Sequence, residues 1–233
     1  MIIKRIIKKI KKYFLNFKQK NQSEEEFYEG LFIKHESWNK PTPNKDELKR
    51  WEIIEYFVNK IELKDQSNIL DLGCGRGWLS NLLSSYGKVL GIEPVGNVVK
   101  YARSLFPDIN FVEGKATSLL NQYSGKFDLI VSSEVIEHVL DNEKDKFVDE
   151  VNSLLNSNGY LIVSTPRKEA QIEWLKFSNP NQPIEDWISE NELKDLFEKR
   201  GFRLLESKRI PVKLKNHSDF IDLYQVCLLQ KKA

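Results

Sequence analysis

Short apolar segments alternate with longer segments of helical period through most of the chain after position 67. Five segments have the length and composition of buried strands: 68–72, 88–93, 109–113, 127–132 and 160–164. Between them, apolar residues recur every three or four positions, as on one face of a helix. Because parallel strands in one sheet are joined by such crossovers, the alternation predicts a doubly wound α/β fold with a parallel sheet.

The pattern changes near the end of the chain. A helix predicted over 190–200 is followed by two apolar segments, 202–208 and 220–229, with no helical segment between them. Strands that follow one another without a crossover pair in antiparallel fashion. We therefore expect a mostly parallel sheet of seven strands that finishes with an antiparallel strand at its edge.

The first twenty residues have a different pattern, that of a basic amphipathic helix. Apolar residues recur at helical spacing, and eight Lys or Arg residues with no acidic residue occupy the other positions. The basic residues interrupt every apolar run, so a secretory signal peptide is not expected. Such a helix favours contact with an anionic membrane surface, and packing against the protein's own domain is the alternative.

Charge is distributed unevenly between this helix and the rest of the chain. Of the 36 Lys and Arg residues, eight lie in the first twenty positions, which leaves 28 against 34 Asp and Glu. An acidic body does not favour nucleic acid, because such binding depends on neutralising phosphates with clustered cations. The chain has two cysteines and no apolar run long enough to span a bilayer, so the sequence predicts a cytoplasmic protein. If residues 1–20 bind a membrane, the protein would be peripheral at its inner face.

The segment between the basic helix and the first strand is rich in aromatic residues. Its rings are concentrated before a helix predicted over 45–61, for which Asn44 or Asp46 is the expected cap. The chain is therefore divided into the helix 1–20, an aromatic and helical cap 21–65, and the α/β domain 66–233.

A glycine-rich turn follows the first predicted strand. Asp71 lies within the strand, and Gly73, Cys74, Gly75 and Gly77 follow it before a helical segment. Alternate glycines permit left-handed backbone and let a ligand approach the main chain closely. The next strand ends in an acid at Glu93, where a carboxylate can accept hydrogen bonds from ribose hydroxyls in Rossmann-like folds.

These ordered motifs resemble the class I S-adenosylmethionine-dependent methyltransferases over about 68–230. The resemblance implies that the glycine turn, with Asp71 and Cys74, and Glu93 hold S-adenosyl-L-methionine, together with Ala116 and Ser132 at the ends of later strands. Lys115 departs from the family, since many members have Asp there beside the adenine. A nicotinamide dehydrogenase is the alternative within the fold, but its usual G-x-G-x-x-G spacing is replaced here by G-x-G-x-G.

Three ionisable residues follow the fourth predicted strand: Glu134, Glu137 and His138. At spacings i, i+3 and i+4 they would share one face of a helix, at the strand ends where ligands collect in such sheets. A carboxylate or imidazole there can take the proton from an acceptor hydroxyl, with His138 the first choice, Glu134 the alternative and Glu137 an orienting residue.

The same string resembles two groups within the family. Quinone-pathway O-methyltransferases have it, and so do small-RNA 2′-O-methyltransferases, in which it supplies three metal ligands and a later His the fourth. The corresponding stretch 181–189 contains no His, so we expect no metal. Bracing of the helix by Glu137 and His138, without a catalytic role, is the alternative.

The long connection 167–187 carries further aromatic residues, as the cap does. Long loops in compact domains tend to form binding lids or to hold a short helix. Resemblance to bacterial methyltransferases of glycan and lipid pathways implies O-methylation of a sugar or glycan-lipid precursor. A small-molecule or quinone-type acceptor, RNA, and a non-catalytic cofactor-binding module are the alternatives.

Overall fold

The computed structural model describes residues 23–64, 66–177, 182–213 and 220–232. The amphipathic helix predicted over 1–20 lies outside these residues. The elements before β4 are α2 Glu24–Glu29, the π-helical turn η1 Gly30–Lys34, α3 Lys45–Lys60, β1 Asn68–Leu72, α4 Trp78–Leu83, β2 Lys88–Glu93, α5 Gly96–Leu105, β3 Asn110–Glu113 and α6 Ala116–Tyr123. The later ones are β4 Phe127–Ser133, the 3₁₀ turns η2 Ile136–His138 and η3 Asp141–Glu143, α7 Lys144–Leu154, β5 Leu155–Pro166, α8 Lys168–Trp174, α9 Glu190–Glu198, β6 Phe202–Lys213 and β7 Phe220–Lys231.

The seven strands form one sheet in the order β3-β2-β1-β4-β5-β7-β6. Strands β1 to β5 pair in parallel, and β7 runs antiparallel to both of its neighbours, β5 and β6. The prediction of a doubly wound, mostly parallel sheet with an antiparallel strand near its edge is confirmed. The antiparallel strand is β7, and β6 beyond it forms the edge of the sheet.

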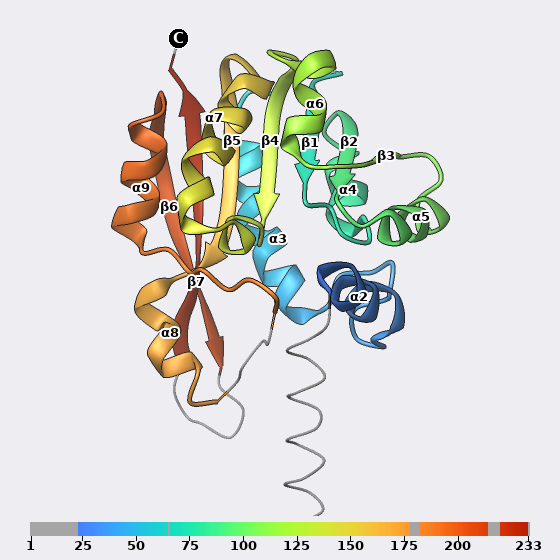
Figure 1. Cartoon of the computed structure of the whole chain (residues 1–233). Helices are drawn as coiled ribbons and strands as arrows, with labels where there is room; N and C mark the ends of the chain where they lie inside the picture. The colour runs from blue at the N-terminus through green and yellow to red at the C-terminus, as the bar shows by residue number, and fades with distance from the viewer. Residues whose placement is uncertain (1–22, 65, 178–181, 214–219, 233) are drawn as a thin grey trace, which may run out of the picture.

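Alternate residues of the strands point to opposite faces of the sheet and build two cores. Leu70 and Ile130 belong to a cluster with α6, α7 and α9, whereas Ile69, Leu129 and Val131 pack with α3 and α4 on the other face. Figure 1 shows α7 and α9 in front of the sheet and α3 behind it. Burial on both faces explains why these strands read as continuous apolar runs.

Helix α3 is capped by Asn44, one of the two residues that the sequence predicted as its cap. The Asn44 side chain accepts hydrogen bonds from the backbone amides of Asp46 and Glu47, each at 3.0 Å, and the Glu47 carboxylate accepts one from the Asn44 amide at 2.7 Å. This reciprocal box satisfies amides that the first turn of a helix leaves free. It also fixes the side chain of Glu47 at the start of the helix.

The carboxyl ends of the parallel strands meet at one edge of the sheet, the lower edge in Figure 1. The helix α2, the beginning of α3 and α8 lie beside this edge in the same view. The elements before β1 and after β5 therefore gather where the glycine turn and the acid of β2 lie. Within the described ranges, no helix combines the length and apolar character that crossing a bilayer requires.

Candidate active site

The glycine turn between β1 and α4 needs glycine for two reasons. Gly73, Gly75 and Gly77 have φ angles of 77°, 51° and 85°, in the left-handed region. Neighbouring side chains also contact the turn closely: a Cβ on Gly73 would lie 2.4 Å from Val135, and one on Gly75 would lie 3.0 Å from the ring of Phe32. The turn is thus held between the cap and the segment after β4.

Glu93, at the end of β2, braces this turn. Its carboxylate accepts hydrogen bonds from the backbone amides of Gly75, at 3.3 Å, and Val95, at 3.1 Å. Burial raises the pKa of Glu93 to about 7, although these two amides oppose the shift. A carboxylate has further lone pairs, so Glu93 can still accept hydrogen bonds from a ligand.

A first cavity of about 400 Å³ opens beside Glu93 and the glycine turn. Among the residues predicted to hold the cofactor, Gly73, Glu93 and Ala116 line it, and Lys115 does so too. The volume falls in the range usual for small-ligand sites. The candidate bases Glu134 and His138 also line it. Lining residues to which the sequence gave no role include Tyr28, Phe32, Pro94, Thr117, Phe147 and Ile184.

The remaining predicted cofactor residues are placed differently. Asp71, Cys74 and Gly75 line a second, adjoining cavity, whereas Gly77 and Ser132 line neither. Gly77 precedes α4 and packs against Phe111, so its part is to shape the turn. Asp71 is buried and accepts a hydrogen bond from the Ser80 hydroxyl at 2.5 Å; burial raises the pKa of Asp71 to about 7.

The second cavity has a volume of about 550 Å³ and shares five residues with the first: Tyr28, Phe32, Gly73, Glu134 and His138. Both ring-rich segments identified in the sequence contribute to it. Trp38 comes from the cap, and Trp174 and Trp187 come from the long connection after β5. Its polar residues include Arg50, Glu134, Glu137 and Glu185. The arrangement is a cofactor-sized cavity joined to an aromatic one.

The prediction of a helix directly after β4 is wrong. Glu134 has a left-handed backbone, with φ 58°, and Ile136–His138 form only a 3₁₀ turn. The amide of Glu134 donates to the carbonyl of Ser164 on β5 at 2.9 Å, so this residue continues the sheet pairing instead of starting a helix. Nevertheless Glu134, Glu137 and His138 all line the second cavity.

The two carboxyls of this cluster bind protons more tightly than usual. Burial, followed by the negative charge of Glu137, raises the pKa of Glu134 to about 7, while Arg50 and a 3.0 Å hydrogen bond from Ser164 oppose the shift. Burial also raises the pKa of Glu137 to about 8, against a 2.9 Å hydrogen bond from Thr165. At neutral pH Glu134 is poised between its two forms and Glu137 is mostly protonated.

His138 is oriented by one hydrogen bond. Its Nδ1 lies 2.9 Å from the carbonyl oxygen of Ile184, and its Nε2 lies 3.8 Å from Oε1 of Glu137. Because a carbonyl can only accept, we assign the proton to Nδ1, which leaves the lone pair of a neutral ring on Nε2. The residue thus has the tautomer that a general base at Nε2 requires.

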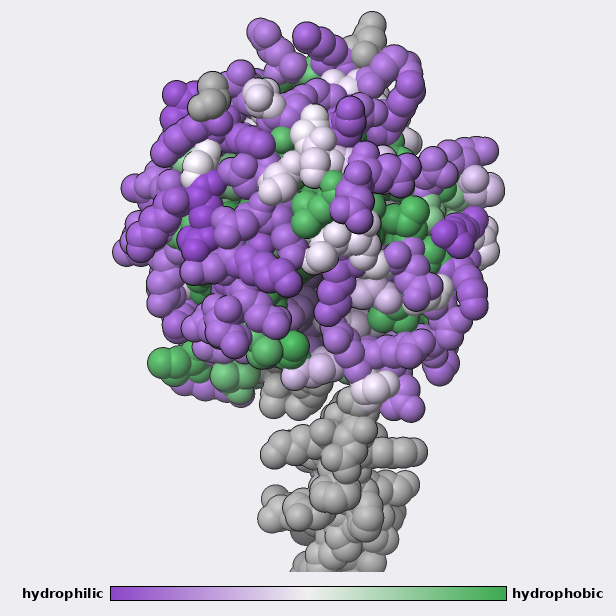
Figure 2. Space-filling model, turned by 45° about the horizontal axis from the view of Figure 1, so that its top comes forward, coloured by the Kyte–Doolittle hydropathy of each residue, from purple (hydrophilic) through white to green (hydrophobic). Residues whose placement is uncertain are grey.

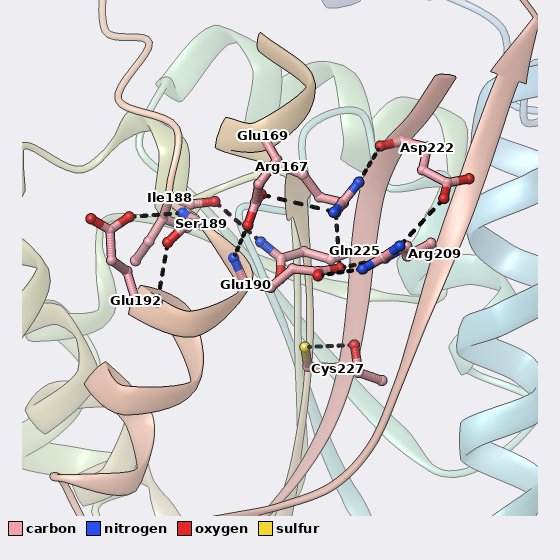
Figure 3. A network of polar contacts seen from close by, with 11 residues as sticks. Arg167, Glu169, Ile188, Ser189, Glu190, Glu192, Arg209, Asp222, Gln225 and Cys227 are labelled. Carbon is pink, nitrogen blue, oxygen red and sulfur yellow. Dashed lines mark hydrogen bonds and ion pairs between the residues drawn. The ribbon is translucent and has the colours of Figure 1, made fainter. Parts of the chain in front are cut away.

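A polar network shown in Figure 3 fixes the start of α9, which directly follows the segment that carries Ile184, Glu185 and Trp187. Glu190 accepts from Nε of Arg167 and Nε of Arg209, both at 2.8 Å, and Gln225 donates to the carbonyl of Ile188 at 3.2 Å. These contacts join the start of α9 to the β6–β7 hairpin. The hairpin therefore supports a wall of the cavity.

A buried ion pair, which the sequence did not reveal, ties the glycine turn to the cap. Arg76 donates to both carboxylate oxygens of Glu47, at 2.6 and 2.7 Å, and also to the carbonyl of Lys40 at 2.6 Å. Both side chains are almost fully buried. The only signal in the sequence was an arginine between two glycines, and its partner lies 29 residues earlier.

In the part of the chain that the structure describes, no group of three or more His, Cys, Asp or Glu side chains is arranged to hold a metal ion. The expectation of metal-independent chemistry stays a prediction for experiment.

Comparison with known proteins places this geometry in a family. Residues 44–207 match the model of a family described as "Methyltransferase domain". An uncharacterized methyltransferase of Bacillus cytotoxicus is 29% identical over 66% of this chain and 76% of its own length. The ubiquinone biosynthesis O-methyltransferase of Azorhizobium caulinodans is 35% identical over 42% of this chain, which spans only 39% of that enzyme.

A solved structure shows the same fold. The Burkholderia thailandensis 1,6-didemethyltoxoflavin-N1-methyltransferase, with its substrate and S-adenosylhomocysteine bound, superimposes with a TM-score of 0.65 at 16% identity, over 95% of this chain and 90% of that one. The left-handed glycine turn, the acid ending β2 and the cavity between them suit the same cofactor. The chain therefore belongs to the methyltransferase-domain family, and it shares its fold with a methyltransferase that binds S-adenosylhomocysteine.

Proposed function

We propose that the protein methylates a hydroxyl oxygen of a small acceptor bound in the second cavity, and that the acceptor is a sugar or a glycan-lipid precursor. The observation that carries the proposal is the junction of the two cavities, where Glu134 and His138 line both. An acceptor in the aromatic cavity would present its hydroxyl to these residues beside the cofactor. Holding the two reactants in this way supplies much of the rate enhancement of a transfer reaction.

The chemistry requires a base at the junction. S-adenosyl-L-methionine supplies an electrophilic methyl group when it is bound. As the acceptor oxygen formed its bond to that carbon, the bond from the carbon to the sulfonium sulfur would break and leave S-adenosylhomocysteine. The O–H bond of the acceptor would break as well, and the proton would pass to Nε2 of His138 or to the carboxylate of Glu134. Positioned bases of this kind typically contribute about a hundredfold to ten-thousandfold in rate.

The walls of the second cavity favour a polyhydroxylated acceptor. Trp38, Trp174 and Trp187 offer flat apolar faces, while Glu134 and Glu185 offer oxygens that accept hydrogen bonds from hydroxyls. Glu185 is oriented by a hydrogen bond from the indole of Trp187. Apolar surface with a few oriented polar groups is the usual composition of a specific small-molecule site.

A quinone-type phenol is the second candidate acceptor. The match to a ubiquinone biosynthesis O-methyltransferase favours it, and the same indole faces can stack on an aromatic ring. An RNA acceptor is less well supported, because the acidic body of the chain offers few phosphate contacts.

The test is to incubate the full chain with methyl-labelled S-adenosyl-L-methionine and fractionated cell extract. We expect label in a sugar or glycan-lipid fraction, unaffected by a chelator, and none with a variant carrying both His138→Ala and Glu134→Gln. Label in a quinone fraction would replace the first acceptor by the second. Label in RNA, or activity that requires a divalent ion, would contradict both. Absence of label from every fraction would favour a non-catalytic binding module.

A further inference from the structure

We infer that the acceptor carries an oxyanion, a carboxylate or a phosphate, and that Arg50 binds it in the second cavity. The inference rests on the proposed function, because it describes the acceptor of the same site.

Arg50 is a buried cation whose guanidinium makes no hydrogen bond or ion pair within the described ranges. It extends from α3, is 5% exposed and lines the second cavity. Its Nε is buried with no hydrogen-bond partner, and no ion pair joins its guanidinium to any residue in the described ranges. Its guanidinium makes a cation–π contact with the ring of Tyr224, whose centroid lies 5.4 Å from Cζ.

The other buried arginines of the described chain show how unusual this is. Arg76 binds both oxygens of Glu47 and two backbone carbonyls, and Arg167 binds Glu190 and the carbonyl of Asp222. Buried charges in proteins are normally paired and hydrogen-bonded in this way, because removing them from water is costly. Arg50 is the exception, and it is the one that faces a cavity.

The carboxylates around Arg50 are already engaged. Glu47 gives both oxygens to Arg76, Glu134 accepts from Ser164, and Glu137 accepts from Thr165. They act on Arg50 through their charge: burial would lower the pKa of its guanidinium, but the surrounding negative charge, that of Glu134 foremost, outweighs this and raises it. The guanidinium therefore stays charged with unused donors.

An oxyanion matches these unused donors. A guanidinium presents five N–H groups in a planar fork that fits a carboxylate or phosphate with two parallel hydrogen bonds. Tyr224 lines the same cavity, and its hydroxyl is a second possible donor, because burial raises the pKa of Tyr224 and keeps it protonated. Glu137, with its pKa raised to about 8, is mostly uncharged at neutral pH and opposes an anion little.

The test uses the full chain saturated with S-adenosylhomocysteine and three probes: benzoate, its neutral analogue benzamide, and inorganic phosphate. Calorimetry should show benzoate binding at least tenfold more tightly than benzamide, with phosphate also binding. Arg50→Gln should lose this preference and the binding of phosphate. Arg50→Lys should retain part of it, since it keeps the charge without the fork. The matched control Arg203→Gln removes an exposed arginine of β6 and should behave as the wild type.

A second readout separates binding from folding. Because Arg50 makes no hydrogen bond or ion pair with a described residue and would lose only its contact with the Tyr224 ring, Arg50→Gln should melt close to the wild-type temperature when no probe is present. Equal affinity of the wild type for benzoate and benzamide, or an unchanged preference in Arg50→Gln, would overturn the inference. So would a labelled product that does not bind an anion exchanger at neutral pH, although the proposed methyl transfer would then stand. Failure of transfer to every acceptor would count against the proposed function, and the probe titration would still decide the role of Arg50.

Discussion

Glu134 has an unusual backbone and an unusual side-chain environment. Its φ of 58° lies in a region that costs a residue with a Cβ about 1–2 kcal/mol. Its carboxyl is also buried, which disfavours the charged form. Such strain persists only where the surroundings enforce it, and here the pairing of its amide with Ser164 does so. The result is a carboxyl at the junction of the two cavities that titrates near neutral pH.

The rate should therefore depend on the ionisation of Glu134. If its carboxylate is the base, kcat/KM should rise as the pH increases through about 7 and level off above it, and Glu134→Gln should abolish this rise. An ascending limb that survives in Glu134→Gln and disappears in His138→Ala would assign the base to the imidazole instead.

The same ionisation should affect stability with the opposite sign. The pKa of Glu134 is raised from 4.5 in the unfolded chain to about 7 in the folded one, so the folded state binds the extra proton between these values. Its contribution to stability is thus present below about pH 4.5 and is lost as the pH rises through 7. Thermal midpoints between pH 5 and 8 should fall less in Glu134→Gln than in the wild type.

His138 is the other candidate base, and its removal gives a separate prediction. His138→Ala should lower turnover at least a hundredfold while the affinity for S-adenosylhomocysteine changes little, because only the proton acceptor is lost. Steady-state kinetics and calorimetry measure the two effects. A loss below tenfold, or a parallel loss of cofactor affinity and thermal stability, would instead show that the ring braces the turn through Ile184.

At the scale of elements, the ion pair between Arg76 and Glu47 joins α3 to the glycine turn. Removing one partner leaves the other charged and buried, which typically costs about 3–5 kcal/mol. We expect Arg76→Met to lower the free energy of unfolding by that amount, as measured by denaturant titration. The exposed pair Lys168–Glu192 is the control, and Lys168→Met should cost less than about 1 kcal/mol.

A double variant distinguishes the pair from simple packing. Replacing both residues, as in Arg76→Met with Glu47→Leu, should recover part of the stability, since neither charge is then left alone. Additive losses would show that the two side chains contribute independently of each other.

Periodicity predicted the elements of the core well, because burial on both faces of the sheet dictates the apolar runs. β1 and β2 have their predicted bounds, and β4 is one residue longer than predicted. The failure after β4 has a non-local cause. The helix expected at Glu134 is replaced by a 3₁₀ turn because its amide pairs with β5, a contact 30 residues away that no local pattern contains.

At the scale of the whole molecule, the cofactor half of the site was more predictable than the acceptor half. Gly73 and Glu93 belong to motifs with fixed spacing along one unit of the fold. Arg50 and Ile184, in contrast, reach the site only because α3 and the segment after α8 fold back to the same sheet edge. On sequence evidence Arg50 was one more charged residue of an amphipathic helix.

The basic segment 1–20 lies outside the described residues, and its membrane role remains a prediction. Each Lys or Arg near an anionic leaflet contributes about 1 kcal/mol, so eight should hold the protein reversibly and release it at high salt. Deleting residues 1–20 should abolish co-sedimentation with phosphatidylserine-containing vesicles and leave turnover on a water-soluble acceptor unchanged. Equal sedimentation of both forms would refute the role.

The rest of the surface gives such binding little help on the face shown in Figure 2. That face is mostly hydrophilic, and its hydrophobic residues appear in separate patches. The large apolar side chains most exposed in the described ranges are Ile172 on α8 and Phe220 at the start of β7. Single exposed residues of this kind are common on soluble domains.

Tyr28 and Phe32 stand on the walls of both cavities, which makes the cap a shared component of two binding sites. A ligand bound in one cavity would order these rings, and a ligand bound afterwards in the other cavity would no longer lose the entropy of ordering them. The two ligands should therefore bind with positive cooperativity. Thermodynamic reciprocity then requires an acceptor to tighten S-adenosylhomocysteine by the same factor by which S-adenosylhomocysteine tightens the acceptor. Phe32→Ala should reduce these two enhancements of affinity together. During turnover, S-adenosylhomocysteine should dissociate fastest after the methylated product has left.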